Sequence, residues 1–222
     1  KAERVYKTAG LEIKDFTDEE YTKIEDDLHT YTDVYRNGTS YKDEYYSGVG
    51  LTSEEYYSLK KMMLKSVYQN GGFYVGKYET GVMENPRYKE SSSATVMPTD
   101  TPVIKQNAYP YNNITCSQAQ TLASNMESGN HTSSLMFGVQ WDLVLKYLET
   151  SWGNYTNNAW NITNVDSKYY KKPNWTSGAY GAKGGYAVVL LSTGASEEFG
   201  KQGIYDLAGN VYEWTLEKTS NS

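Results

Sequence analysis

The sequence contains a single cysteine, no long apolar run and no concentration of basic residues. One Cys among 222 residues allows no internal disulfide and no thiolate metal cage. The mean hydropathy is -0.71, and no apolar run approaches the roughly 20 residues that a bilayer-spanning helix needs, so we expect no membrane span. The net charge of -6 comes without a basic stripe to neutralise phosphates, which argues against a nucleic-acid-binding protein.

The residues that are present suffice for a globular core. Hydrophobic residues make up 38% of the chain and aromatic residues 14%, which excludes global disorder. The length fits one domain, or a small domain with an added segment. Tyrosines number 23 against 4 phenylalanines, so most aromatic surface carries a hydroxyl group. This composition fits a recognition surface, and it fits equally well a Tyr-rich secreted or surface protein without special binding.

Residues 1–68 are predicted to form a helical N-terminal extension. Thr17 with Glu20, and Thr52 with Glu55, form capping boxes, in which each side chain satisfies a free amide of the first helical turn. Apolar residues follow each box at helical spacing: Tyr21, Ile24, Leu28 and Tyr31 in the first helix, and Tyr56, Leu59, Met63 and Val67 in the second. The glycine pair at 71–72 is expected to end the second helix.

The pattern changes after this glycine pair. Residues 73–79 alternate with period two, which predicts a strand. Residues 80–110 are rich in Ser, Thr and Pro and are predicted to form a long surface loop. Thr115 and Gln118 form a third capping box, whose helix is expected to bury Ala119, Leu122, Ala123 and Met126. Residues 135–147 predict a fourth helix, which buries Trp141, Val144, Leu145 and Leu148 along one side.

The later part of the chain has few periodic signals. Residues 151–185 are dense in Asn, Gly, Trp and Tyr, and such a long irregular stretch indicates function or bound ions. Residues 187–191 predict a short apolar strand. Cys116 lies in a first helical turn without a neighbouring His or second Cys, so we expect a structural role. His29 and His131 lack a nearby nucleophile motif and are expected at the surface.

The closing segment resembles a known family. Residues 204–215 read I-Y-D-L-A-G-N-V-Y-E-W-T and are similar to G-L-x-D-M-x-G-N-V-W-E-W-T, the signature of the formylglycine-generating enzyme (sulfatase-modifying factor) family. Residues 72–79, 114–123 and 135–142 resemble three further family blocks in the expected order, although in the last block only Leu135 and Trp141 are identical. The resemblance spans about residues 71–215.

The resemblance implies an α+β, C-type-lectin-like fold with much irregular structure. Residues 71–222 would form the family domain, incomplete at its C-terminus. The family's signature loop binds calcium, and this would assign the carboxylates of Asp206 and Glu213 and the carbonyls of Gly209 and Val211 as ligands. Asn210, Trp214 and Trp141 would be signature residues of the frame, with Trp214 buried. In the plain interpretation, Asp206 caps a turn and Glu213 forms a surface ion pair.

The resemblance also bears on catalysis. Oxidases of the family hold copper with a cysteine pair, and this chain has one cysteine, so copper and oxidase activity are not expected. The first hypothesis is a non-catalytic domain that binds or displays an unknown protein or carbohydrate ligand, extracellularly, on a bacterial or phage surface. The alternative is a fragment of a formylglycine-generating oxidase, or of a related superfamily oxidase, that lacks its C-terminal active-site segment. A third hypothesis is a subunit of a larger surface assembly.

Overall fold

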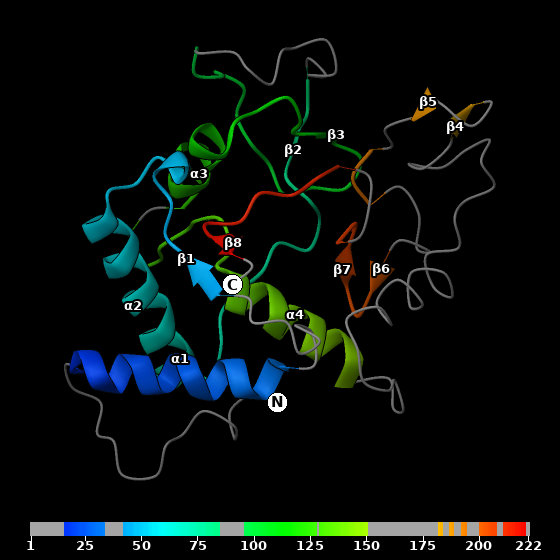
Figure 1. Cartoon of the computed structure of the whole chain (residues 1–222). Coiled ribbons are helices and arrows are strands. Elements are labelled where there is room, and N and C mark those ends of the chain that lie inside the picture. Colours follow the sequence, from blue (N-terminus) through cyan, green and yellow to red (C-terminus); the bar gives the residue numbers. More distant parts are fainter. Residues whose placement is uncertain are drawn as a thin grey trace.

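The chain has a mixed α+β structure in which helices combine with short strand pairs (Figure 1). The β1–β8 pair joins segments that are far apart in the sequence. The computed structural model describes residues 16–33, 42–84, 96–127, 129–150, 182–183, 187–188, 192–194, 200–207 and 211–220. No helix within these ranges is both long and apolar enough to cross a membrane.

The first two helices begin where their capping boxes predict. In α1 (Asp18–Thr32), Thr17 N donates to Glu20 Oε2 at 2.7 Å and Glu20 N donates to Thr17 Oγ1 at 3.3 Å. The same reciprocal pair opens α2 (Ser53–Asn70). Gly71 ends α2 with a φ of 77°, and its N–H bonds the Val67 carbonyl at 3.0 Å. This left-handed conformation favours glycine, so the predicted end of α2 is confirmed.

The third helix has the predicted start but a different buried face. The Thr115–Gln118 capping box opens α3 (Cys116–Ser124). Ala119 and Leu122 are only half-buried, whereas the side chains of Gln118 and Gln120 are buried. Gln120 Oε1 accepts a bond from Leu135 N at 3.0 Å, and Gln118 Nε2 donates to Val96 O. Both amides are buried because they bond backbone groups outside the helix.

The fourth helix, α4 (Gly138–Thr150), starts three residues later than the predicted range 135–147. Side chains satisfy the amides at its start: Phe137 N donates to Gln140 Oε1 of the first turn at 3.0 Å, and Gly138 N donates to Glu217 Oε2, from outside the helix, at 2.7 Å. Glu217 therefore caps this helix from a position 79 residues away, which no local pattern indicates. The predicted buried side is largely confirmed, since Val144, Leu145 and Leu148 are buried and Trp141 is half-buried.

The strands are short antiparallel pairs. They are β1 (Lys42–Glu44) with β8 (Lys218–Ser220), β2 (Gly81–Val82) with β3 (Tyr109–Pro110), β4 (Ala182–Lys183) with β5 (Ala187–Val188), and β6 (Gly200–Lys201) with β7 (Ile204–Tyr205). A 3-10 turn covers Ser47–Val49. The β1–β8 pair joins residues 42–44 to residues 218–220.

Two predictions for residues 73–110 are corrected. Residues 73–79 form no strand ladder, although Phe73 and Val75 point inward and Tyr74 outward as the alternation predicts. The stretch 80–110 is not one surface loop, because its ends pair as β2 and β3. The predicted strand 187–191 is represented by β5, and residues 189–191 lie outside the described ranges, as does most of the irregular stretch 151–185.

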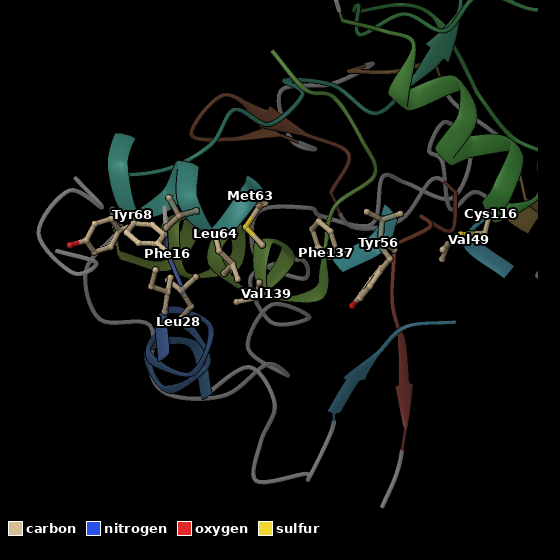
Figure 2. Packing of buried hydrophobic residues seen from close by; sticks show 13 residues of the cluster. Phe16, Leu28, Val49, Tyr56, Met63, Leu64, Tyr68, Cys116, Phe137 and Val139 are labelled. Carbon is tan, nitrogen blue, oxygen red and sulfur yellow. The ribbon is translucent and has the colours of Figure 1, made fainter. Parts of the chain in front are cut away.

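The largest apolar cluster takes side chains from both sides of the predicted 68/71 boundary (Figure 2). Its buried members are Phe16, Ile24, Leu28, Val49, Tyr56, Met63, Leu64, Val67, Tyr68, Cys116, Phe137, Val139 and Leu216. α1 lies against both α2 and α4 (Figure 1). The division into 1–68 and 71–222 remains a prediction, and the main core extends across it.

Candidate functional site

The turn after β7 positions Asp206, the first predicted calcium ligand. Asp206 is 4% exposed and has a φ of 60°, a left-handed conformation that Asp tolerates better than most residues. Its Oδ2 atom accepts a hydrogen bond from Gly194 N at 2.5 Å. A Cβ on Gly194 would meet the Tyr78 ring at 2.4 Å, so only glycine lets this backbone approach the carboxylate. Asp206 thus stabilises a turn through its side chain, as expected in the interpretation without calcium.

Glu213, the second predicted carboxylate, interacts electrostatically with Asp206. Desolvation by the surrounding protein atoms, the larger cause, and the charge of Asp206, the second, raise the pKa of the Glu213 carboxyl to about 8. Glu213 is nevertheless exposed over part of its surface, so water screens this effect and its direction matters more than its size. Burial also raises the pKa of Asp206, although the bond from Gly194 opposes the shift. The turn therefore brings together two carboxyl groups that both favour the protonated state.

The other predicted ligands and signature residues are placed only in part. Val211 is half-buried in the described segment, whereas Gly209 and Asn210 lie outside the described residues. Among the residues that the structure places, no group of three or more His, Cys, Asp or Glu side chains could hold a metal ion. A cation at Asp206 and Glu213 would therefore need carbonyl or water oxygens as its remaining ligands.

The predicted burial of Trp214 is wrong. The residue is 49% exposed, and its indole Nε1 donates to the Ile114 carbonyl at 3.0 Å. The signature segment is anchored instead by the residues that follow. Leu216 is fully buried and its N–H bonds the Met136 carbonyl at 2.9 Å. The indole fixes the segment by one polar contact, because an indole N–H needs a partner when one edge of the ring is covered.

Replacing Trp214 by Ala should therefore cost only about 1–2 kcal/mol of unfolding free energy, the sum of one hydrogen bond and half of the ring's burial. Chemical denaturation measures this loss. Trp214→Phe is the control, because it keeps most of the ring and removes the bond to Ile114. A loss of about 3 kcal/mol or more for the alanine variant, as for a fully buried aromatic, would contradict the half-exposed placement.

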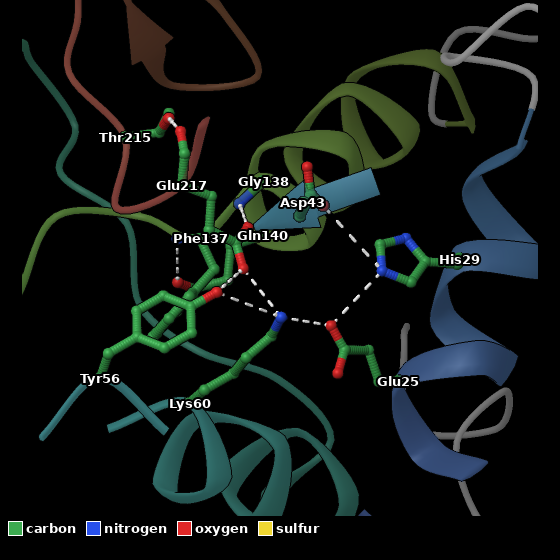
Figure 3. Close-up of polar contacts among 10 residues, drawn as sticks. All are labelled: Glu25, His29, Asp43, Tyr56, Lys60, Phe137, Gly138, Gln140, Thr215 and Glu217. Atoms are coloured by element: carbon green, nitrogen blue, oxygen red, sulfur yellow. Dashed lines mark hydrogen bonds and ion pairs between the residues drawn. The ribbon is translucent and has the colours of Figure 1, made fainter. Parts of the chain in front are cut away.

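A buried polar cluster that sequence reasoning missed lies between α1, α2 and the segment before β8 (Figure 3). Lys60 of α2 is 6% exposed, and its Nζ contacts Glu217 Oε1 at 2.8 Å and also Glu25 Oε1. The Tyr56 hydroxyl donates to the same Glu217 oxygen. On the solvent side, His29 Nε2 lies 3.5 Å from Glu25 Oε1. One ammonium group is therefore shared by two carboxylates from distant parts of the chain.

The charges of the cluster reinforce one another. Burial alone would lower the pKa of Lys60, but Glu217 and Glu25 outweigh it and raise the pKa. Burial would raise the pKa of Glu25, but the hydrogen bond with His29 and the charge of Lys60 hold it below its ordinary value. Burial and then the Glu217 charge raise the pKa of Tyr56, so its hydroxyl stays a donor. At neutral pH the cluster is an ion triad with a neutral Tyr.

This triad serves stability better than it serves chemistry. Both oxygens of Glu217 are engaged, one by Lys60 and Tyr56 and the other by the Gly138 amide. A catalytic lysine needs a lowered pKa, whereas the pKa of Lys60 is raised. Only a weak signal for the cluster is present in the sequence, namely a lysine at position 60 within one helical turn of the apolar stripe residues Tyr56 and Met63.

The remaining reactive side chains have ordinary environments. Cys116 is buried, its Sγ donates to the Thr215 carbonyl at 3.5 Å, and burial raises the pKa of its thiol, in accord with a structural role. His131 is exposed as predicted, whereas His29 is half-buried between α1 and β1, where it also lies 3.9 Å from Asp43 Oδ2. The prediction of a surface position for His29 is therefore corrected.

No protein-family model, curated protein or solved structure matches the chain. The resemblance to the formylglycine-generating enzyme family therefore rests on residues 204–215 and on the three weaker blocks before them. The geometry of the turn and of the polar cluster is independent of that resemblance.

Proposed function

We propose that this chain is a non-catalytic ligand-binding or display domain of the formylglycine-generating enzyme type, with a lectin-like fold and a calcium ion in the 206–213 turn. The observation that supports the cation is the buried Asp206 carboxyl, whose charge helps to raise the pKa of the Glu213 carboxyl seven residues away. A divalent cation relieves this repulsion and takes hard carboxylate oxygens as ligands. The carboxyl pair therefore fits calcium, which would hold the turn in its folded shape.

Exposed aromatic side chains support the binding role. Tyr74 and Tyr212 are almost fully accessible, and Trp214 is half-exposed beside Glu213. Tyr and Trp on a surface supply rigid contact area together with a polar tip, which suits recognition of a protein or a carbohydrate. Lys60 and Cys116 are engaged in structural contacts, which supports a role without catalysis. A bacterial or phage surface is the setting we propose for such a domain.

Calcium binding at neutral pH should release protons, up to about one per ion, because the raised pKa of the Glu213 carboxyl increases the fraction that is protonated before the ion binds. Titration calorimetry in buffers of different ionisation enthalpy measures this number. A carboxyl with a raised pKa makes the calcium-free fold lose stability as pH rises from its ordinary value towards 8. Calcium should therefore raise the Tm more at pH 8 than at pH 6.

Glu213→Gln should abolish both the proton release and the rise in Tm, while Glu127→Gln, which changes an exposed carboxylate on another loop, should leave both unchanged. An identical Tm in excess calcium and in chelator at both pH values would refute the cation proposal. Glycan-array and surface-display binding of the wild-type protein test the ligand-binding role separately.

A further inference from the structure

α1 carries its own N-terminal cap, whereas α4 depends in part on distant residues for its capping. The Thr17–Glu20 capping box satisfies the first amides of α1 from within residues 17–20. The first amide of α4 instead depends on Glu217, and its Tyr147 and Leu148 carbonyls accept bonds from Gln202 Nε2 at 3.0 and 3.1 Å. α1 can therefore leave its site without orphaning the capped groups at its start, whereas α4 cannot.

The polar contacts that tie α1 to the rest of the chain involve side chains that already touch water. Asp18 pairs with Lys61 at 2.5 Å and is 81% exposed at its side chain. Glu25 and His29, which contact Lys60 and Asp43, are 25% and 30% exposed. Exposed and half-exposed pairs contribute little net stability because water replaces the partner. The Asp18–Lys61 pair can therefore break at low cost, and Glu25 and His29 regain contact with water when α1 moves away from the buried Lys60 and Asp43.

Lys60 keeps a counter-ion when α1 departs. Glu217, with a side chain only 1% exposed, holds the ammonium group at 2.8 Å and also bonds Tyr56 and Gly138. With α1 in place, the Glu25 and Glu217 carboxylates share the Lys60 ammonium group. Without α1, the Lys60 ammonium group and the Glu217 carboxylate remain as a pair. Departure of α1 therefore leaves Lys60 with a counter-ion and returns Glu25 to solvent, whereas Asp43, with a side chain only 3% exposed, loses its contact with His29.

From these contacts we infer that α1 is a strap that opens while α2, α4 and the segment 214–220 stay folded. Apolar packing of Ile24 and Leu28 closes the strap, and Leu28 lies next to Leu64 of α2 and Val139 of α4 (Figure 2). Opening uncovers this apolar face of the two helices. The strap is a low-energy opening unit of the kind that hydrogen exchange resolves.

Hydrogen exchange of the whole chain, read by mass spectrometry, tests the strap. Amides of α1 should exchange about tenfold faster than those of α2 and of residues 214–220. Glu25→Gln should accelerate exchange in α1 alone by a further few-fold, because it weakens the tie to Lys60. Asp27→Asn is the matched control, since within the described part of the chain Asp27 pairs with the exposed Lys23 of the same helix at 2.8 Å, and the variant should change nothing.

A thiol-labelling measurement checks the same opening independently. A Leu28→Cys variant places a thiol under the strap, and the native Cys116, buried against the Thr215 carbonyl, serves as the reference in the same molecule. We expect Leu28→Cys to be labelled about tenfold faster than Cys116. Equal labelling of the two thiols, or equal protection of α1, α2 and residues 214–220, would show one cooperative unit and overturn the strap.

Discussion

Replacing Lys60 by Met is expected to lower the unfolding free energy by about 3–5 kcal/mol at pH 7, because it leaves the Glu25 and Glu217 carboxylates without their shared counter-ion. Glu217 is the more costly of the two, since its side chain is 1% exposed and cannot reach water unless the segment moves. Denaturant titration followed by circular dichroism measures the loss. Between the lowered pKa of Glu25 and the raised pKa of Lys60 the triad is fully charged, so pH 7 is the proper condition.

Two variants separate the lost charge from other effects of the Lys60 substitution. Lys61→Met changes the next residue, an exposed lysine paired with Asp18, and should leave the denaturation midpoint nearly unchanged. The neutral triple variant Glu25→Gln, Lys60→Met, Glu217→Gln removes the buried charges together and should recover most of the loss. If Lys60→Met proves as stable as Lys61→Met, the triad is not the electrostatic centre of this core.

The helices could be predicted from sequence where their signals are local. Three capping boxes specify the starts of α1, α2 and α3, and the glycine at 71 specifies the end of α2, because each signal acts within four residues. The start of α4 could not be predicted, since its capping carboxylate comes from Glu217. The β1–β8 pair could not be predicted for the same reason, because the partner of β1 lies about 175 residues away in the sequence.

The candidate sites, too, could be predicted from the sequence only in part. The signature resemblance picked out Asp206 and Glu213, and the structure brings their carboxyl groups into electrostatic contact. Burial of Trp214 was a wrong inference, because a signature residue specifies identity and not depth, and here Leu216 fills the core instead. The Lys60 triad left almost no trace in the sequence, since an isolated lysine near an apolar stripe is commonly solvated along its stem.

Leu216→Ala should lower the unfolding free energy by about 3 kcal/mol. A loss of this size would make the end of the signature segment an important packing position of the core. Leu216 is fully buried in the same cluster as Leu28 and Leu64, so its loss leaves a cavity between the C-terminal segment and the N-terminal helices. Leu59→Ala is the matched control, because Leu59 is only half-buried against that cluster and should cost about 1 kcal/mol.

The comparison also tests whether the core is continuous across the predicted 68/71 boundary. If α2 and the segment around Leu216 share one core, Leu216→Ala shifts a single unfolding transition, and tyrosine fluorescence and helical circular dichroism report the same midpoint. If residues 1–68 fold independently, the substitution leaves part of the helical signal at its original midpoint and produces two transitions. A cost for Leu216→Ala no larger than that for Leu59→Ala would likewise argue against the shared core, because the same side chain removed from a fully buried site must leave the larger cavity.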